Sequence, residues 1–287
     1  MRSKSKRATV VVVGVLALVV AVPSLSGAGL VGEALQWRTL KAPAPSWYTP
    51  ALHEQVLAAG TQGVPLPADA DIPASSLAFL GIRPGQLLII DGGTLCTSNF
   101  VFTNGGNFFI GTAGHCGNEG DQVTMLYLPG GLVDIGNIVY STGDAGIGHD
   151  FALISIKPAL NGDVSPSMAH WGGPTGVYTG SGPEVVLHSG WGLVVGTGGT
   201  PRAGVGVEWT ANEWRFEGVI TPGDSGSAAR VLGGQAAGNI THIAVDGGVF
   251  PPVFNAGTSM TKIMQLIGGT YQLATCSAIP WPLPDCP

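Results

Sequence analysis

A serine between glycines, in the string TPGDSGS at Thr221–Ser227, is the residue of this sequence best suited to covalent chemistry. Because glycine has no Cβ, the main chain around Ser225 can bend with positive φ and bring two N–H groups to one point. A hydroxyl beside converging N–H groups suits a nucleophile whose reaction produces a negatively charged oxygen. By itself the string does not identify a nucleophile, because a chain with 46 glycines contains many such turns.

Two strings upstream supply the groups that an activated serine requires. TAGHC contains His115, and GHDFAL contains Asp150. An imidazole can take the serine proton near neutral pH, and a buried carboxylate can fix the imidazole tautomer and stabilise its charged form. Asp144 is the competing carboxylate, but an apolar strand directly follows Asp150 and would bury it beside the core. The sequence therefore predicts a catalytic set of His115, Asp150 and Ser225.

The order of these three residues along the chain is that of the chymotrypsin arrangement. With TAGHC, HDFAL and GDSG in this order, the sequence resembles the chymotrypsin/trypsin-like serine peptidases over about residues 86–268, most closely their secreted bacterial members. The resemblance implies an all-β fold of two six-stranded antiparallel β-barrels with the active site between them. It also implies a serine endopeptidase that works through an acyl-enzyme intermediate, without a cofactor.

The same resemblance assigns further roles. The oxyanion hole would consist of the backbone N–H groups of Gly223 and Ser225. Val219 stands where trypsins carry an aspartate at the base of the pocket, so the expected P1 residue is small or apolar rather than basic. Three more residues are assigned to substrate binding along the channel: Thr241, His242 and Ile243.

The sequence also departs from the family pattern. Ser227 and Ala228 follow the GDSG turn in place of the usual Gly-Pro or Gly-Ser. No string like the family's Ile-Val-Gly-Gly start precedes Cys96, so the activation switch of the animal zymogens is not predicted. Asp224, which receives the new N-terminus in those zymogens, therefore needs another partner. Thr241 aligns only loosely with the family's serine that hydrogen-bonds the triad carboxylate.

Composition favours many short strands. Charged residues make up 10% of the chain, against about 25% in average soluble domains. Short β-rich runs separated by Gly and Asn turns form two series, which predicts a sandwich or barrel architecture; the family resemblance implies barrels, at 85–170 and 171–287. One helix with Thr258 or Ser259 as its cap is predicted near the end of the second region, where apolar residues recur at helical spacing: Met260, Ile263, Met264 and Ile267.

The N-terminal region has its own organisation. Residues 1–26 have the layout of a secretory signal peptide, with basic residues, an apolar run and then small residues. The alternative is a retained anchor, although the fifteen apolar residues from Ala8 to Val22 are fewer than the ~20 that span a bilayer. We expect export with cleavage and no stable membrane association afterwards. Residues 27–84, interrupted by prolines, are predicted to be a pro-segment, with an ordered N-terminal extension as the alternative.

Four cysteines in an exported chain predict two disulfides. Pairing Cys96 with Cys116 and Cys276 with Cys286 has the lowest loop-closure cost of the three possible connectivities. The first pair also resembles the family bridge that ties the histidine turn to a neighbouring strand. No metal site is predicted, because the cysteines are assigned to bridges and no H-x-x-x-H string occurs; calcium binding by loop aspartates stays open.

The net charge of the chain bears on which partners it can bind. The formal net charge is −6 and no basic cluster follows the leader, which argues against nucleic-acid binding. The expected partner is a protein or peptide substrate, and the protein is expected to be a secreted monomer. The alternative function is a catalytically silent relative that binds proteins or the cell envelope. The other histidines are assigned structural or surface roles: His53, His149, His170 and His188.

Overall fold

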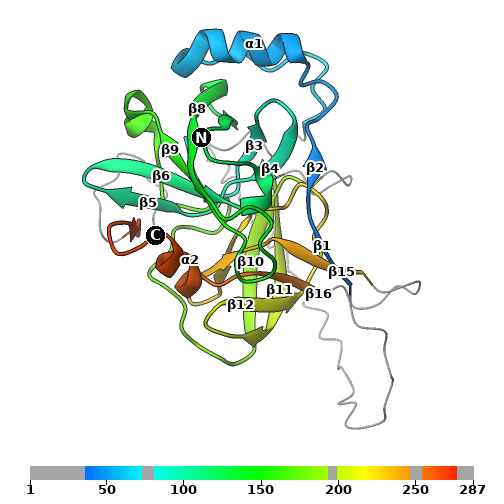
Figure 1. Ribbon diagram of the computed structural model, residues 1–287, viewed down its shortest axis with the longest axis vertical. Coiled ribbons are helices and arrows are strands. Elements are labelled where there is room, and N and C mark those ends of the chain that lie inside the picture. Colours follow the sequence, from blue (N-terminus) through cyan, green and yellow to red (C-terminus); the bar gives the residue numbers. More distant parts are fainter. Residues whose placement is uncertain (1–35, 73–80, 193–198, 246–253, 277–287) are drawn as a thin grey trace, which may run out of the picture. The chain divides into compact units, whose positions relative to one another are not determined.

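Two antiparallel β-sheets contain the strands of the described part of the chain (Figure 1). The computed structural model describes most of the sequence, over these ranges: 36–72, 81–192, 199–245 and 254–276. The predicted signal peptide, residues 1–26, lies outside them. The predicted all-β class is confirmed.

One sheet consists mainly of residues from the first half of the chain. Its nine strands run in the order β17-β5-β6-β9-β8-β7-β3-β4-β2. Their bounds are β2 Ala42–Pro43, β3 Leu87–Ile90, β4 Thr94–Thr97, β5 Val101–Asn104, β6 Asn107–Thr112, β7 Gln122–Tyr127, β8 Gly131–Ser141, β9 Ala152–Ile156 and β17 Gln272–Leu273. Buried aliphatic side chains such as Leu88, Ile110 and Ile154 form the interior, and burying them supplies the main stabilising term of this sheet.

The other sheet consists mainly of residues from the second half. Its eight strands run in the order β1-β15-β16-β12-β11-β10-β13-β14. Their bounds are β1 Gln36–Thr39, β10 Glu184–Gly190, β11 Thr200–Trp209, β12 Glu213–Glu217, β13 Ala228–Val231, β14 Ala236–Asn239, β15 His242–Val245 and β16 Phe254–Thr258. Trp214 is fully buried and stacks between Trp209 and Phe216, with ring centroids 5.3 and 4.8 Å away. Aromatic burial of this kind contributes strongly to a core.

The N-terminal segment takes part in both sheets. β1 pairs with β15 in the second sheet, and β2 pairs with β4 in the first. Helix α1, Pro50–Ala59, follows and lies against β8 (Figure 1); a short 3-10 helix, Gly60–Gln62, ends it. Residues 36–72 are therefore an ordered extension in this structure, whereas removal of residues 27–84 as a pro-segment stays a prediction.

The strand count differs from the expectation. The resemblance implied six strands in each barrel, and the sheets contain nine and eight. Three of the additional strands are β1, β2 and β17, which come from the two ends of the described chain. Their sequences are two to four residues long, too short to show an alternating pattern.

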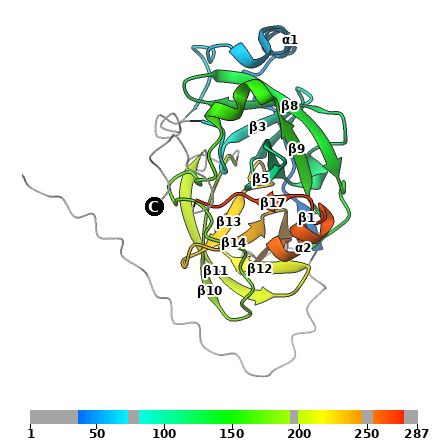
Figure 2. The same cartoon turned by 90° about the vertical axis from the view of Figure 1, so that its left-hand side faces the viewer.

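The predicted C-terminal helix is confirmed as α2, Met260–Leu266. The Ser259 hydroxyl caps it by accepting a bond from the backbone N–H of Lys262. α2 packs beside β14, and the chain then continues to β17 next to β5 (Figure 2). Two further 3-10 helices in the described ranges are Gly114–Cys116 and Pro158–Asp163. None of the helices in the described ranges is both long and apolar enough to cross a membrane.

Candidate active site

The structure brings His115, Asp150 and Ser225 into one hydrogen-bonded line. His115 Nδ1 lies 2.6 Å from Asp150 Oδ2, and His115 Nε2 lies 2.6 Å from Ser225 Oγ. The backbone N–H of His115 also donates to Asp150 Oδ1 at 3.0 Å. The 2.6 Å contact with Asp150 is typical of a hydrogen bond to a carboxylate. His115 and Asp150 come from the first sheet region, and Ser225 comes from the second.

Local structure fixes the histidine and the carboxylate. His115 sits in the 3-10 turn that follows β6, and the neighbouring Cys116 is bonded to Cys96 in β4. This predicted disulfide is confirmed. The side chain of Asp150 is fully buried, so its ionised form depends on the bonds it accepts. The second predicted bridge involves Cys286, which lies outside the described residues.

The backbone of Asp150 is hydrogen-bonded to residues of the second sheet. The Thr258 hydroxyl accepts a bond from the Asp150 N–H and donates one to the Asp150 carbonyl, both at 3.1 Å. The amide of Asn239 donates to the same carbonyl at 2.8 Å. Asn239 and Thr258 end β14 and β16, so these strands of the second sheet position the acid of the first. Sequence reasoning missed both residues.

Thr241 does not occupy the position expected from the resemblance. Its hydroxyl lies 2.7 Å from His242 Nδ1 and 3.3 Å from the carbonyl oxygen of Ala256, rather than on the carboxylate of Asp150. The ring of His242 lies between the two instead, with Nδ1 3.8 Å from Asp150 Oδ2. The prediction for Thr241 therefore needs correction: it contacts the histidine beside the acid.

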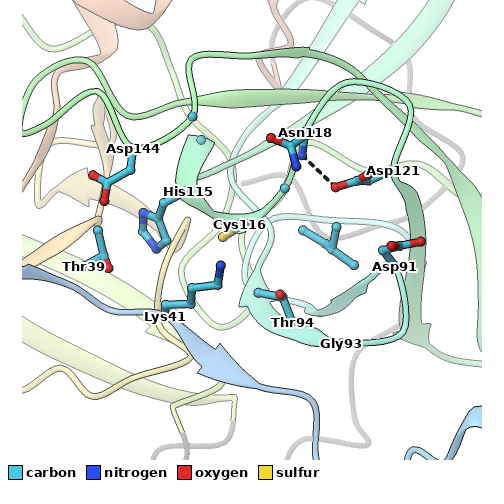
Figure 3. Close-up of a pocket in the computed structure, with 14 residues that line it drawn as sticks. Thr39, Lys41, Asp91, Gly93, Thr94, His115, Cys116, Asn118, Asp121 and Asp144 are labelled. Atoms are coloured by element: carbon cyan, nitrogen blue, oxygen red, sulfur yellow. Dashed lines mark hydrogen bonds between the residues drawn. The ribbon is translucent and has the colours of Figure 1, made fainter.

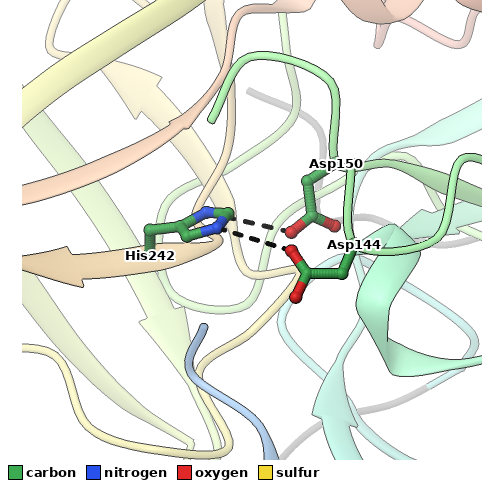
Figure 4. A group of neighbouring side chains, drawn as sticks. All are labelled: Asp144, Asp150 and His242. Atoms are coloured by element: carbon green, nitrogen blue, oxygen red, sulfur yellow. Dashed lines mark ion pairs between the residues drawn. The ribbon is translucent and has the colours of Figure 1, made fainter. Parts of the chain in front are cut away.

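His242, Asp144 and Asp150 form a small cluster (Figure 4). His242 Nε2 is 3.9 Å from Asp144 Oδ1. Burial lowers the pKa of His242, and the nearby Asp150 carboxylate opposes this shift. The candidate ligand atoms of the three lie within 4.8 Å of one another. However, both carboxylate oxygens of Asp150 already accept bonds from His115, so the cluster is better explained by the triad than by a metal ion.

The turn that carries Ser225 requires its glycines. Gly223 and Gly226 have φ values of 103° and 89°, a region that strongly favours glycine. A Cβ at Gly223 would lie 2.6 Å from the carbonyl oxygen of Trp191, and one at Gly226 would lie 2.3 Å from that of Thr97. The backbone N–H of Gly223, one of the two predicted oxyanion-hole donors, donates to the carbonyl oxygen of Leu40 at 2.9 Å.

A buried ion pair also stabilises the turn that carries Ser225. Arg202, in β11, bonds both carboxylate oxygens of Asp224, at 2.6 and 2.7 Å. The backbone N–H groups of Gly192 and Thr221 complete the coordination of that carboxylate. Arg202 is therefore the partner of Asp224 that the sequence did not reveal. The only signal was one basic residue in the otherwise uncharged run 200–207.

The predicted substrate-binding residues fall into two groups. Val219 is 65% exposed, so its side chain does not form the base of an apolar pocket as the resemblance suggested. His242 and Ile243 lie in β15, where they pair with Thr39 and Arg38 of β1. The strand edge formed by these two residues is therefore paired with the N-terminal segment of the same chain.

A cavity of about 320 Å³ opens beside the imidazole of His115 (Figure 3). Its wall includes Cys116 and Asp144 from the first sheet region, together with Thr39 and Lys41 from the N-terminal segment. The N-terminal segment therefore contributes residues on both sides of Leu40, Thr39 and Lys41, to the surroundings of His115.

Comparison with known proteins supports the fold. No protein-family model matches the chain, and no curated protein matches it. Among solved structures, Thermobifida fusca Protease A is 22% identical with a TM-score of 0.50, and the match covers 68% of this chain and 98% of that one. Cellulomonas bogoriensis chymotrypsin is 19% identical with a TM-score of 0.48, covering 68% and 100%. The first of these likenesses shows that the chain has the chymotrypsin-like serine protease fold.

Proposed function

We propose that this protein is a serine endopeptidase that hydrolyses peptide bonds through Ser225, His115 and Asp150. The observation that carries the proposal is the unbroken line of two 2.6 Å contacts from the serine hydroxyl through the imidazole to a buried carboxylate. This order of nucleophile, base and orienting acid is what acyl transfer requires. The chymotrypsin-like fold supports the same chemistry by analogy.

Each group has a defined step in the proposed mechanism. Ser225 Oγ attacks the substrate carbonyl carbon while His115 Nε2 takes its proton, and Asp150 stabilises the resulting imidazolium through Nδ1–H. The N–H groups of Gly223 and Ser225 stabilise the oxyanion. His115 then protonates the leaving amine, and a water molecule, deprotonated by His115, releases the acyl group from Ser225.

The second sheet supports the acid in this mechanism. Asp150 must remain ionised although its side chain is fully buried, which is costly unless its oxygens accept hydrogen bonds. Two bonds from His115 satisfy those oxygens. The bonds from Asn239 and Thr258 hold the backbone of Asp150 in place, which restricts the positions that its carboxylate can take relative to His115.

We further propose that the protein is exported and acts as a monomer on protein or peptide substrates outside the cell. The signal-like layout of residues 1–26 and the Cys96–Cys116 bridge support this location, because disulfides persist in oxidising compartments. N-terminal sequencing of protein secreted by the producing cell tests it. A preparation that still starts at Met1 would reject cleavage of the leader.

Profiling the hydrolysis of a peptide library by the purified protein and by Ser225→Ala tests the activity. We expect Ser225→Ala to lower kcat by about 10⁶-fold. Ser227→Ala is the matched control, because Ser227 is also fully buried and lies two residues away, and it should keep most of the activity. Equal turnover by wild type and Ser225→Ala would reject the mechanism. The absence of turnover in every form would favour a silent relative that binds proteins or the cell envelope.

A further inference from the structure

We propose that residues 36–43 are bound in the active site as an internal substrate, and that the protein cleaves its own Leu40–Lys41 bond. The proposal rests on the proposed function, because it requires Ser225 to act as the nucleophile. It adds the position of the first bond to be cut and the side chain that the pocket prefers. Four features of the structure support it.

The first feature is the pairing of β1 with β15. Thr39 lies opposite His242 and Arg38 opposite Ile243 in an antiparallel register. The backbone N–H of Leu40 continues this pairing by donating to the carbonyl oxygen of Thr241 at 3.1 Å. An extended peptide that adds a strand to an exposed sheet edge is a common way to bind a substrate or ligand. The segment therefore lies on the second sheet as a bound peptide would.

The second feature is the position of the Leu40 carbonyl. Its oxygen accepts a hydrogen bond from the Gly223 N–H at 2.9 Å. In acyl transfer the oxyanion-hole donors bind the oxygen of the carbonyl that is attacked. Because Gly223 belongs to the tight turn that carries Ser225, the residue whose carbonyl it holds is the one on the acyl side of the bond to be cleaved. That residue is Leu40.

The third feature is the continuation of the chain onto the opposite sheet. Ala42 pairs with Leu95 in β4, and the N–H of Ala44 donates to the carbonyl oxygen of Gly93 at 2.9 Å. Between the two pairings, Thr39 and Lys41 lie beside the His115 imidazole (Figure 3). The segment thus passes from the second sheet to the first, with the Leu40–Lys41 bond at the crossing next to the triad.

The fourth feature is the burial of the Leu40 side chain. It has no exposed surface and belongs to the apolar cluster that includes Phe216, Ile220 and Ile240. An aliphatic residue of this size suits such surroundings, whereas a charged one would be strongly disfavoured there. Ser225 is itself fully buried with the segment in place, so a second peptide has no access to its hydroxyl. The segment must therefore leave before external substrates are cleaved.

The reaction balances with water as the only additional reactant. Ser225 Oγ bonds to the Leu40 carbonyl carbon, its proton passes to His115 Nε2, and the bond to the Lys41 nitrogen breaks as that nitrogen takes the proton. A water molecule then gives a proton to His115 Nε2 as its oxygen bonds to the acyl carbon. The ester bond to Ser225 Oγ breaks, and His115 returns the proton to Ser225. The products are a carboxylate at Leu40 and an amino group at Lys41.

Intact mass and N-terminal sequencing of the full-length chain test the proposal. We expect wild type to acquire a new N-terminus at Lys41, and Ser225→Ala to keep the Leu40–Lys41 bond intact. Leu40→Asp should block cleavage at this bond, whereas Leu232→Asp, at a leucine that is 63% exposed, should not. A wild-type chain that stays uncut at this bond would overturn the proposal, as would equal cutting in Ser225→Ala.

A free peptide of residues 36–43 keeps the test independent of folding defects in Leu40→Asp. We expect the processed enzyme to hydrolyse it after Leu40 with a kcat/KM at least about 100-fold above that for the same peptide carrying Leu40→Asp. If the enzyme hydrolyses library peptides but neither this peptide nor its own chain after Leu40, the inference fails while the proposed function stands. If a chain that begins at Lys41, and so lacks the bound segment, neither hydrolyses any peptide nor reacts with a fluorophosphonate at Ser225, both fail.

Discussion

The two halves of the molecule secure their parts of the proposed triad by different means. In the first, the Cys96–Cys116 bridge adjoins the turn of His115, so a covalent bond holds the proposed base. In the second, the turn of Ser225 contacts the ion pair between Arg202 and Asp224, so charge and hydrogen bonds hold the proposed nucleophile. A covalent tie acts mainly on the unfolded chain, whereas a buried ion pair becomes destabilising as soon as one partner is lost. The two halves should therefore respond differently to substitution.

The largest effect is expected at the acid of the first half. Asp150→Asn should lower kcat by about 10⁴-fold, because the amide favours the wrong tautomer of His115 while leaving the geometry nearly intact. Steady-state kinetics on a peptide substrate measure this loss. Asp144→Asn is the control, since that carboxylate is 63% exposed and contacts only His242 in the cluster. A larger loss in Asp144→Asn would move the role of the acid to Asp144.

The next effect concerns the second half. Arg202→Leu should lower the free energy of unfolding by about 3–5 kcal/mol, because it leaves the fully buried Asp224 carboxylate without its cation. Chemical denaturation measures the change. Arg215→Leu removes a guanidinium that is 36% exposed and paired with Glu208 and Glu213, and should cost less than about 1 kcal/mol. Similar losses in both variants would contradict the supporting role of the buried pair.

A smaller effect is expected from the covalent tie of the first half. Replacing Cys96 and Cys116 together by alanine should lower the free energy of unfolding by about 3 kcal/mol, the value for a loop of this length. kcat should change by less than about tenfold, since Asp150 still accepts hydrogen bonds from the backbone N–H and the ring of His115. Denaturation and kinetics on the same sample separate the two quantities. Unchanged stability would show that the bridge does not restrict the unfolded chain.

The smallest effect is a dependence on pH in the second half. His188 is fully buried, neither of its ring nitrogens has a hydrogen-bond partner in the described part of the chain, and burial together with Arg202 lowers its pKa well below 6.5. Below about pH 6.5 the unfolded chain therefore binds the proton more readily, and stability falls as the pH falls. His188→Leu should remove the part of the stability loss at acid pH that His188 causes. The free energy of unfolding, measured from pH 8 to pH 5, tests this. If the variant loses as much stability as wild type over this range, His188 is not the cause.

The sequence predicted features that depend on neighbouring residues alone. His115, Asp150 and Ser225 each lie in a short string with a recognisable pattern, and the order of the three strings along the chain allowed them to be proposed as one site. The spacing before Ile267 likewise predicted α2, because helical periodicity needs no knowledge of distant residues.

Features that depend on strand register could not be predicted. Arg202 reaches Asp224 only because β10 and β11 pair in one particular register, and Thr258 meets Asp150 across 108 positions of sequence. The prediction for Thr241 placed it within a strand, whereas it lies in the connection between β14 and β15, where strand alternation does not fix the direction of a side chain.

The course of the N-terminal segment has a kinetic consequence. Pairing of β2 with β4, and the hydroxyl of Tyr48 bonded to Thr124, hold the chain after Lys41 in place independently of β1. The amine released by cleavage would thus stay tethered at a high effective concentration next to the ester on Ser225, where it can re-form the original bond before water arrives. Maturation would then be slower than hydrolysis of an untethered peptide with the same sequence, and the release of residues ahead of Lys41 would set its pace.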